Sequence, residues 1–162
     1  MNKFVTIAGL ALAATIAGSA NAQLVAHKDL SVTTAVAIAQ TAVQTCKSQG
    51  YNVSAHILGR AGEVLVAMRG DDTGPQTYEN SFKKAWTARA TRAPSLNFAN
   101  TVKGNPTAGA IHLSNMVPAQ GGLPIMVGED AIGAVGVSGA PGGDKDEACA
   151  KAGLDKVAAD LK

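Results

Sequence analysis

A stretch rich in glycine and apolar residues, 121–144, constrains the fold of this chain more than any other segment. Within it, 123–127 and 131–138 are short apolar runs typical of strands, and the Gly-Glu-Asp between them is turn-forming sequence. Gly133 and Gly136 in the second run indicate close approach by another backbone or a ligand. The stretch therefore predicts a β-hairpin, after which 139–143 turns the chain into its last helix.

The N-terminus has the organisation of a secretory signal peptide. Lys3 supplies a short positive region, residues 4–17 are almost all apolar, and Ala-Asn-Ala at 20–22 is a small-x-small cleavage site. The apolar run is too short to cross a bilayer. We therefore expect a signal peptide at 1–22, a domain at 23–162, export to the periplasm or the extracellular space, and no membrane span.

Charge gives no reason to expect a nucleic-acid partner. The formal net charge is +2, and loss of Lys3 with the signal peptide would leave +1. No basic patch interleaved with aromatic residues follows in the rest of the chain.

The rest of the chain alternates between helical periodicity and strand alternation. The pattern predicts a helix from an N-cap at Ser31 to about Gly50, strands at 52–58 and 63–69, a helix from Pro75 to Pro94, a short helix at 95–102, an extended segment at 111–117, the hairpin, and a helix at 145–161. Hairpins imply a mostly antiparallel sheet that helices cover, so we expect one α+β domain. His56 is expected to be hydrogen-bonded on a strand, and Tyr78 and Trp86 to pack in the core.

Five stretches, in this order, resemble the GlcG/HbpS-like family: RGDDTGPQTYE at 69–79, KAWTA at 84–88, APS at 93–95, GGLP at 121–124, and GAVGVSGA at 133–140, followed by Asp144. The resemblance implies a profilin-like fold, with an antiparallel five-stranded sheet and helices packed on its faces. It also implies a secreted haem-binding protein that forms oligomers up to an octamer. Some members degrade haem, and some accompany a sensor protein.

The resemblance also implies candidate haem-binding residues. Haem-binding members place a threonine hydroxyl at the iron, before the Gly-Gly-x-Pro strand, and the matching position here is Ser114. If 111–117 is extended, His112, Ser114 and Met116 share one face, and imidazole, hydroxyl and thioether can each approach iron. The alternative is a strand whose polar side faces water. Lys84, in the family-like Lys-Ala-Trp-Thr, is expected to anchor the propionates.

Several other sites are not expected. The family's surface Glu-x-x-Glu iron motif is broken, because Phe82 stands three places after Glu79. The three histidines share no metal-ligand spacing, and no nucleophile elbow or phosphate-binding glycine motif is present. Arg69, Lys83, Arg89 and Arg92 could face propionates, but each is expected to lie on a solvated surface.

Cys46 and Cys149 are the two cysteines, and each lies on one of the predicted terminal helices. In an oxidising compartment they could form a disulfide, or they could remain two buried thiols, and the sequence leaves both open.

These observations predict an exported, oligomeric haem-binding protein, with slow haem degradation as a further expectation. Two competing hypotheses remain: a non-enzymatic binder of a corrinoid or a small organic acid, and an accessory protein of an extracytoplasmic sensor.

Overall fold

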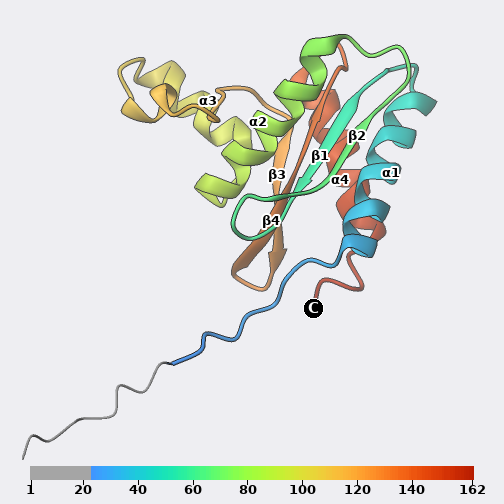
Figure 1. Ribbon diagram of the computed structural model, residues 1–162. Helices are drawn as coiled ribbons and strands as arrows, with labels where there is room; N and C mark the ends of the chain where they lie inside the picture. Colours follow the sequence, from blue (N-terminus) through green and yellow to red (C-terminus); the bar gives the residue numbers. More distant parts are fainter. Residues whose placement is uncertain (1–22) are drawn as a thin grey trace, which may run out of the picture.

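The computed structural model describes residues 23–162, and the expected signal peptide lies outside them (Figure 1). In chain order the elements are α1 (Val32–Ser48), β1 (Ser54–Leu58), β2 (Val64–Arg69), α2 (Pro75–Thr91), α3 (Ser95–Gly104), the 3-10 helix η1 (Gly109–His112), β3 (Gly122–Val127), β4 (Asp130–Ser138) and α4 (Gly143–Lys156). The α+β class is confirmed. None of the helices within 23–162 is long and apolar enough to cross a bilayer.

The sheet within the described residues has four strands in the order β2-β1-β4-β3, and every neighbouring pair is antiparallel. The expected five-stranded sheet is therefore wrong. The segment expected to supply the additional strand, 111–117, forms the end of η1 and a turn instead. The glycine-rich hairpin is confirmed as β3 and β4, which are joined at Gly128 with a φ of +60°.

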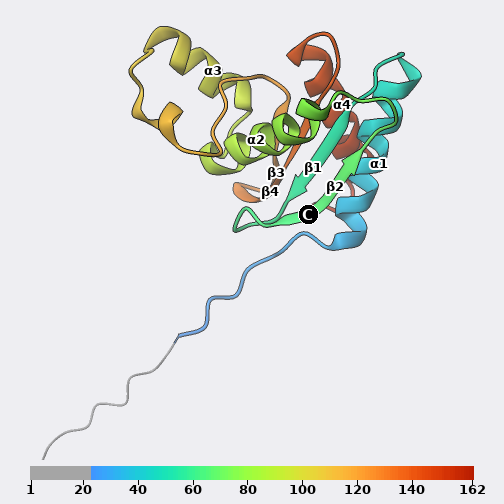
Figure 2. The same ribbon diagram turned by 45° about the horizontal axis from the view of Figure 1, so that its top comes forward.

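Helices cover both faces of the sheet. Figures 1 and 2 show α1 and α4 packed side by side on one face and α2 on the other, with α3 beyond α2. All five residues of β1 are buried for this reason, although its sequence alternates between apolar and polar. The polar side chains Ser54 and His56 therefore lie beneath α2 rather than in solvent.

The core has two parts of different character. The larger cluster fills the space between the sheet and the α1–α4 layer, and the smaller consists of Leu58, Ala85, Ala88 and Ala134 beneath α2. Small residues let α2 lie close to β4. A Cβ added to Gly136 would stand 2.2 Å from the Ser81 carbonyl oxygen, so this position admits no side chain.

The ends of two helices follow the expected local chemistry. Ser31 is the N-cap of α1, where its hydroxyl accepts a hydrogen bond of 3.1 Å from the Thr34 N–H. Pro75 is the first residue of α2, where its missing N–H costs nothing. The last helix ends at Lys156, several residues before the expected 161, because Val157 turns back to the Leu154 carbonyl.

The two cysteines form a disulfide between the terminal helices. Cys46 of α1 and Cys149 of α4 are fully buried, and their Cα atoms are 5.6 Å apart. The disulfide decides between the two alternatives that the sequence left open, a disulfide or two buried thiols. It joins parts of the chain that are 103 residues apart.

Candidate functional site

The segment with the candidate iron-facing residues spans 109–117, from the start of η1, and its part 111–117 does not have the extended conformation that the sequence predicts. Its backbone closes short turns: the Leu113 N–H donates to the Ala110 carbonyl at 3.2 Å, and the Met116 N–H donates to the Leu113 carbonyl at 3.0 Å. His112, Ser114 and Met116 therefore do not share one face of a strand. This expectation is wrong because the segment bonds to itself rather than to a neighbouring strand.

The same segment is a surface feature attached to α2. The Val117 N–H donates to the Thr87 hydroxyl at 3.0 Å, which ties the end of the segment to the helix. His112 and Ser114 are exposed, Met116 is half-buried, and the Leu113 side chain is 60% exposed. An imidazole and a hydroxyl beside an exposed apolar side chain are thus available to a ligand that approaches from solvent.

Lys84 is not available to a ligand carboxylate in this arrangement. It is 3% exposed, and its Nζ donates to Asp146 Oδ2 at 2.6 Å and to the Val137 carbonyl at 3.1 Å. The role of Lys84 as an anchor for an incoming anion stays a prediction, and the geometry does not support it, because the ammonium is already paired inside the protein. Sequence reasoning assigned Asp146 only to the first turn of the last helix, and no local signal joins it to Lys84.

The Lys84–Asp146 pair lies between α2, β4 and α4, beside a polar cleft of about 790 Å³. Burial raises the pKa of the Asp146 carboxyl above its ordinary value, although the Lys84 ammonium opposes that shift. Gly121 makes room for the pair, since a Cβ there would stand 2.9 Å from Lys84 Nζ. The glycine-rich stretch thus shapes the protein around this ion pair.

An aromatic cluster lies along the other flank of α2. The ring of His56 contacts Tyr78 edge-on at a centroid distance of 4.5 Å and Phe82 at 5.8 Å, and Phe82 lies 5.8 Å from Trp86. Trp86 packs against the smaller core cluster as expected. Tyr78 is 45% exposed, so the expectation that it fills the core is wrong.

His56 is a buried, neutral imidazole. Its Nδ1 lies 2.8 Å from the Ser81 hydroxyl, which confirms that it is hydrogen-bonded. Burial lowers its pKa from 6.5 to about 4. The folded protein therefore binds a proton at His56 less readily than the unfolded chain does. The fold has its full stability above the unfolded pKa of 6.5, and it loses stability as the pH falls from there towards the folded pKa of about 4.

Acidification from pH 7 to pH 5 is therefore expected to destabilise the protein through His56 by about 2 kcal/mol. Urea unfolding at both pH values would measure this, with the His56→Gln variant as the comparison because Gln does not titrate. The wild-type protein should lose more stability than the variant across this interval. Equal losses in the two proteins would show that His56 is not the titrating group.

Metal ligands do not gather within residues 23–162, where no group of three or more His, Cys, Asp or Glu side chains could hold an ion. The Glu79 carboxylate, which begins the broken iron motif, pairs with Lys83 on the same helix.

These features define a class: a single α+β domain whose antiparallel sheet is covered by helices on both faces, with candidate ligand-facing groups on the surface beside α2. Residues 30–155 match the family model described as "Haem degrading protein HbpS-like". The chain belongs to this HbpS-like family, which confirms the resemblance of its motifs.

Solved structures agree with this assignment. The crystal structure of HbpS is 34% identical with a TM-score of 0.77, and the match covers 82% of this chain and 93% of that one. A double mutant of Streptomyces reticuli HbpS is 32% identical with a TM-score of 0.78, covering 88% and 97%. A complex of PduOC with heme is 24% identical with a TM-score of 0.72, covering 78% and 94%, and it shows the fold alone. No curated protein matched the sequence.

Proposed function

We propose that this protein binds haem, and that the surface segment 109–117 supplies the group that faces the iron. One observation carries the proposal: this chain belongs to the HbpS-like family, and it exposes His112 and Ser114 on the segment before β3. The heme complex of PduOC, which has the same fold, supports a tetrapyrrole as the ligand class. Lys84 is left out of the proposed site because it is buried and paired.

The residues present fit part of what haem requires. A haem site needs an apolar surface and a group that can approach the iron. Leu113 is 60% exposed, Ile111 and Met116 are half-buried, and His112 and Ser114 supply an imidazole and a hydroxyl. A ring on this open surface would keep much of its apolar area in water, which is unfavourable. We therefore include in the proposal a second copy of the chain that covers the ring, in a homo-oligomer of up to eight copies.

Haem degradation belongs to the same proposal, since the matching family model is described by that activity. The haem would itself supply this chemistry, in which dioxygen or peroxide reacts at the iron and the porphyrin is attacked. The chain would hold the ring through the apolar residues of 109–117. Ser114 or His112 would present a hydroxyl or an imidazole to the iron, since both side chains are exposed.

Export and a sensor partner complete the proposal. The pattern of residues 1–22 and the disulfide both suit an oxidising compartment outside the cytoplasm. Three measurements test the parts of the proposal separately. The mass of the exported protein tests removal of residues 1–22, sedimentation of the haem-loaded protein tests the oligomer, and binding to an extracytoplasmic sensor domain tests the sensor partner.

Replacing His112 and Ser114 together by alanine is expected to abolish saturable haemin binding, because the imidazole and the hydroxyl proposed to face the iron would both be lost. The measurement is a haemin titration of the domain 23–162, followed by Soret absorbance. His27→Ala is the matched control, since His27 is an exposed histidine on the N-terminal segment. An unchanged Soret band in the double variant would remove both residues from the site.

Addition of ascorbate or peroxide to the haem-loaded protein tests degradation. A Soret band that bleaches faster than that of free haemin would support degradation, and a band that persists would support a carrier.

A further inference from the structure

A small cavity of about 200 Å³ lies between the C-terminal part of α2 and the β1–β2 loop, away from the segment proposed for haem. Three arginines line it, Arg60 from the loop and Arg89 and Arg92 from the end of α2, together with Trp86. These arginines come from different parts of the chain, and only the tertiary structure brings them together.

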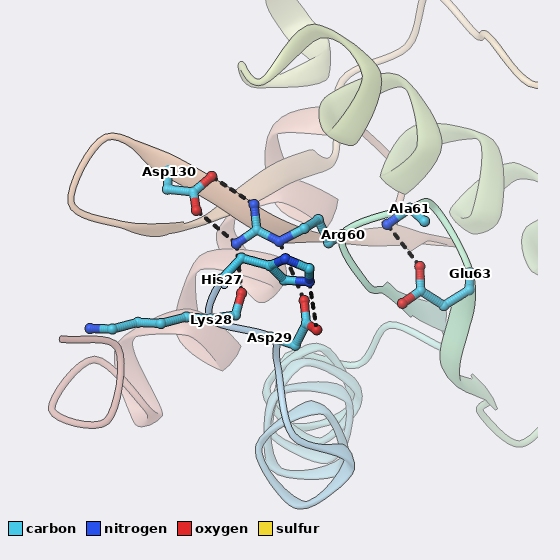
Figure 3. A network of polar contacts seen from close by, with 7 residues as sticks. All are labelled: His27, Lys28, Asp29, Arg60, Ala61, Glu63 and Asp130. Carbon is cyan, nitrogen blue, oxygen red and sulfur yellow. Dashed lines mark hydrogen bonds and ion pairs between the residues drawn. The ribbon is translucent and has the colours of Figure 1, made fainter. Parts of the chain in front are cut away.

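Arg60 forms a fixed wall of the cavity. Its guanidinium donates to the two carboxylate oxygens of Asp130 at 2.9 and 2.7 Å, and to the Lys28 carbonyl at 2.6 Å (Figure 3). Asp29 accepts a further hydrogen bond from Arg60 Nε at 3.3 Å. The charge of Arg60 is therefore balanced by its acidic neighbours, and its position is held by the N-terminal segment and by β4.

Arg89 and Arg92 are not balanced in this way. Within residues 23–162, neither side chain has a hydrogen bond or an ion pair. Arg92 is exposed to solvent, whereas Arg89 is half-buried and its Nε is buried without a partner. Burial, and then the charges of Arg92 and Arg60, lower the pKa of the Arg89 guanidinium, although the nearby carboxylates of Asp130 and Glu63 oppose that shift. Arg89 lies in the last turn of α2, where the negative end of the helix dipole favours a cation. The dipole does not supply a hydrogen-bond acceptor for the buried Nε. An unpaired buried donor is costly, so an incoming acceptor would be stabilising here.

Trp86 gives the cavity an apolar wall. The loop lies directly against the indole: a Cβ on Gly62 would stand 2.7 Å from Trp86 Cζ3, and the φ of Gly62 is +86°. At about 200 Å³ the cavity is smaller than the roughly 300–1,000 Å³ of sites for drug-sized ligands. It has room for a single ring with one acidic group and not for a whole tetrapyrrole.

We propose that this cavity binds a small planar organic acid, with the carboxylate against the guanidinium groups of Arg89 and Arg92 and the flat body against Trp86. Guanidinium groups pair with carboxylates through two parallel hydrogen bonds, and aromatic faces accept planar groups. This site is separate from the segment proposed for haem and does not depend on that function.

Benzoate is the probe, and Trp86, the single tryptophan of the chain, is the reporter. Titration of the haem-free domain should change the tryptophan fluorescence saturably. The affinity should fall roughly tenfold or more in Arg89→Gln and in Arg92→Gln, because each loses a charge-assisted hydrogen bond. Lys103→Gln, which removes an exposed cation from α3, should bind as the wild-type protein does.

Two further probes separate the parts of the proposal. Benzyl alcohol, which has the ring without the carboxylate, and inorganic phosphate, which has the charge without the ring, should both bind much more weakly than benzoate. Equal binding of either probe would overturn the assignment, as would the absence of saturation with benzoate. Unchanged affinity in both arginine variants, with unfolding midpoints like that of the wild-type protein, would also overturn it.

Discussion

Loss of the Cys46–Cys149 disulfide is expected to lower the free energy of unfolding by about 4 kcal/mol, because the bond closes a loop of about 100 residues in the unfolded chain. The variant is Cys46→Ala with Cys149→Ala, and chemical denaturation measures the change. Both sulfurs are buried between α1 and α4, so part of any loss in this variant would come from the space that the smaller side chains leave.

Reduction of the wild-type protein separates these two contributions. The reduced protein keeps both sulfur atoms in place and loses only the covalent bond, so its unfolding midpoint should fall by most of the amount seen in the variant. If the midpoints with and without reductant coincide, the disulfide does not contribute to stability and the loop-closure argument does not apply to this chain.

Lys84→Met is expected to destabilise the protein by about 3–5 kcal/mol, because it leaves the Asp146 carboxylate buried without its partner. The loss should be largest near neutral pH. It should shrink as the pH falls, since protonation of Asp146 removes the buried charge and burial already raises the pKa of that carboxyl. Urea unfolding at several pH values measures both effects.

Two further variants make this test specific. Lys84→Met with Asp146→Leu removes both charges and should recover most of the stability, because a buried ion pair can be replaced by apolar side chains at small cost. Lys83→Met, at the preceding position of α2, breaks only a partly exposed pair with Glu79 and should cost about 0.5 kcal/mol or less. If the single and double variants at 84 and 146 lose the same stability, the buried charge is not the cause.

The fold was largely predictable because its signals are local. Caps and turns specify the backbone within a few residues and do not depend on distant parts of the chain. Examples are the N-cap Ser31, Pro75 at the start of α2, and the turn at Gly128. The ordered motifs added the family, which the match over 30–155 confirms. The prediction failed at 111–117, where alternation of polar and apolar residues suggested a strand that the structure does not form.

The candidate site was less predictable because its chemistry depends on distant contacts. Ser114 and His112 lie on the surface and remain available to a ligand, but Lys84 does not, because Asp146 meets it from a position 62 residues later in the chain. The cavity at Arg89 and Arg92 likewise depends on Arg60 and on the β1–β2 loop. No spacing in the sequence marks these side chains as neighbours.

By itself, then, the sequence determined the order of the four long helices and of the strands of the two hairpins, although not the conformation of 111–117, and it determined the family. Periodicity, capping and turn residues act over short distances, so they can be recognised from neighbouring positions alone. Only the tertiary structure decided that the cysteines meet, that Lys84 is paired inside the protein and that 109–117 lies on the surface. Those outcomes follow from how the two helical layers pack on the sheet, which brings together residues that are far apart in the chain.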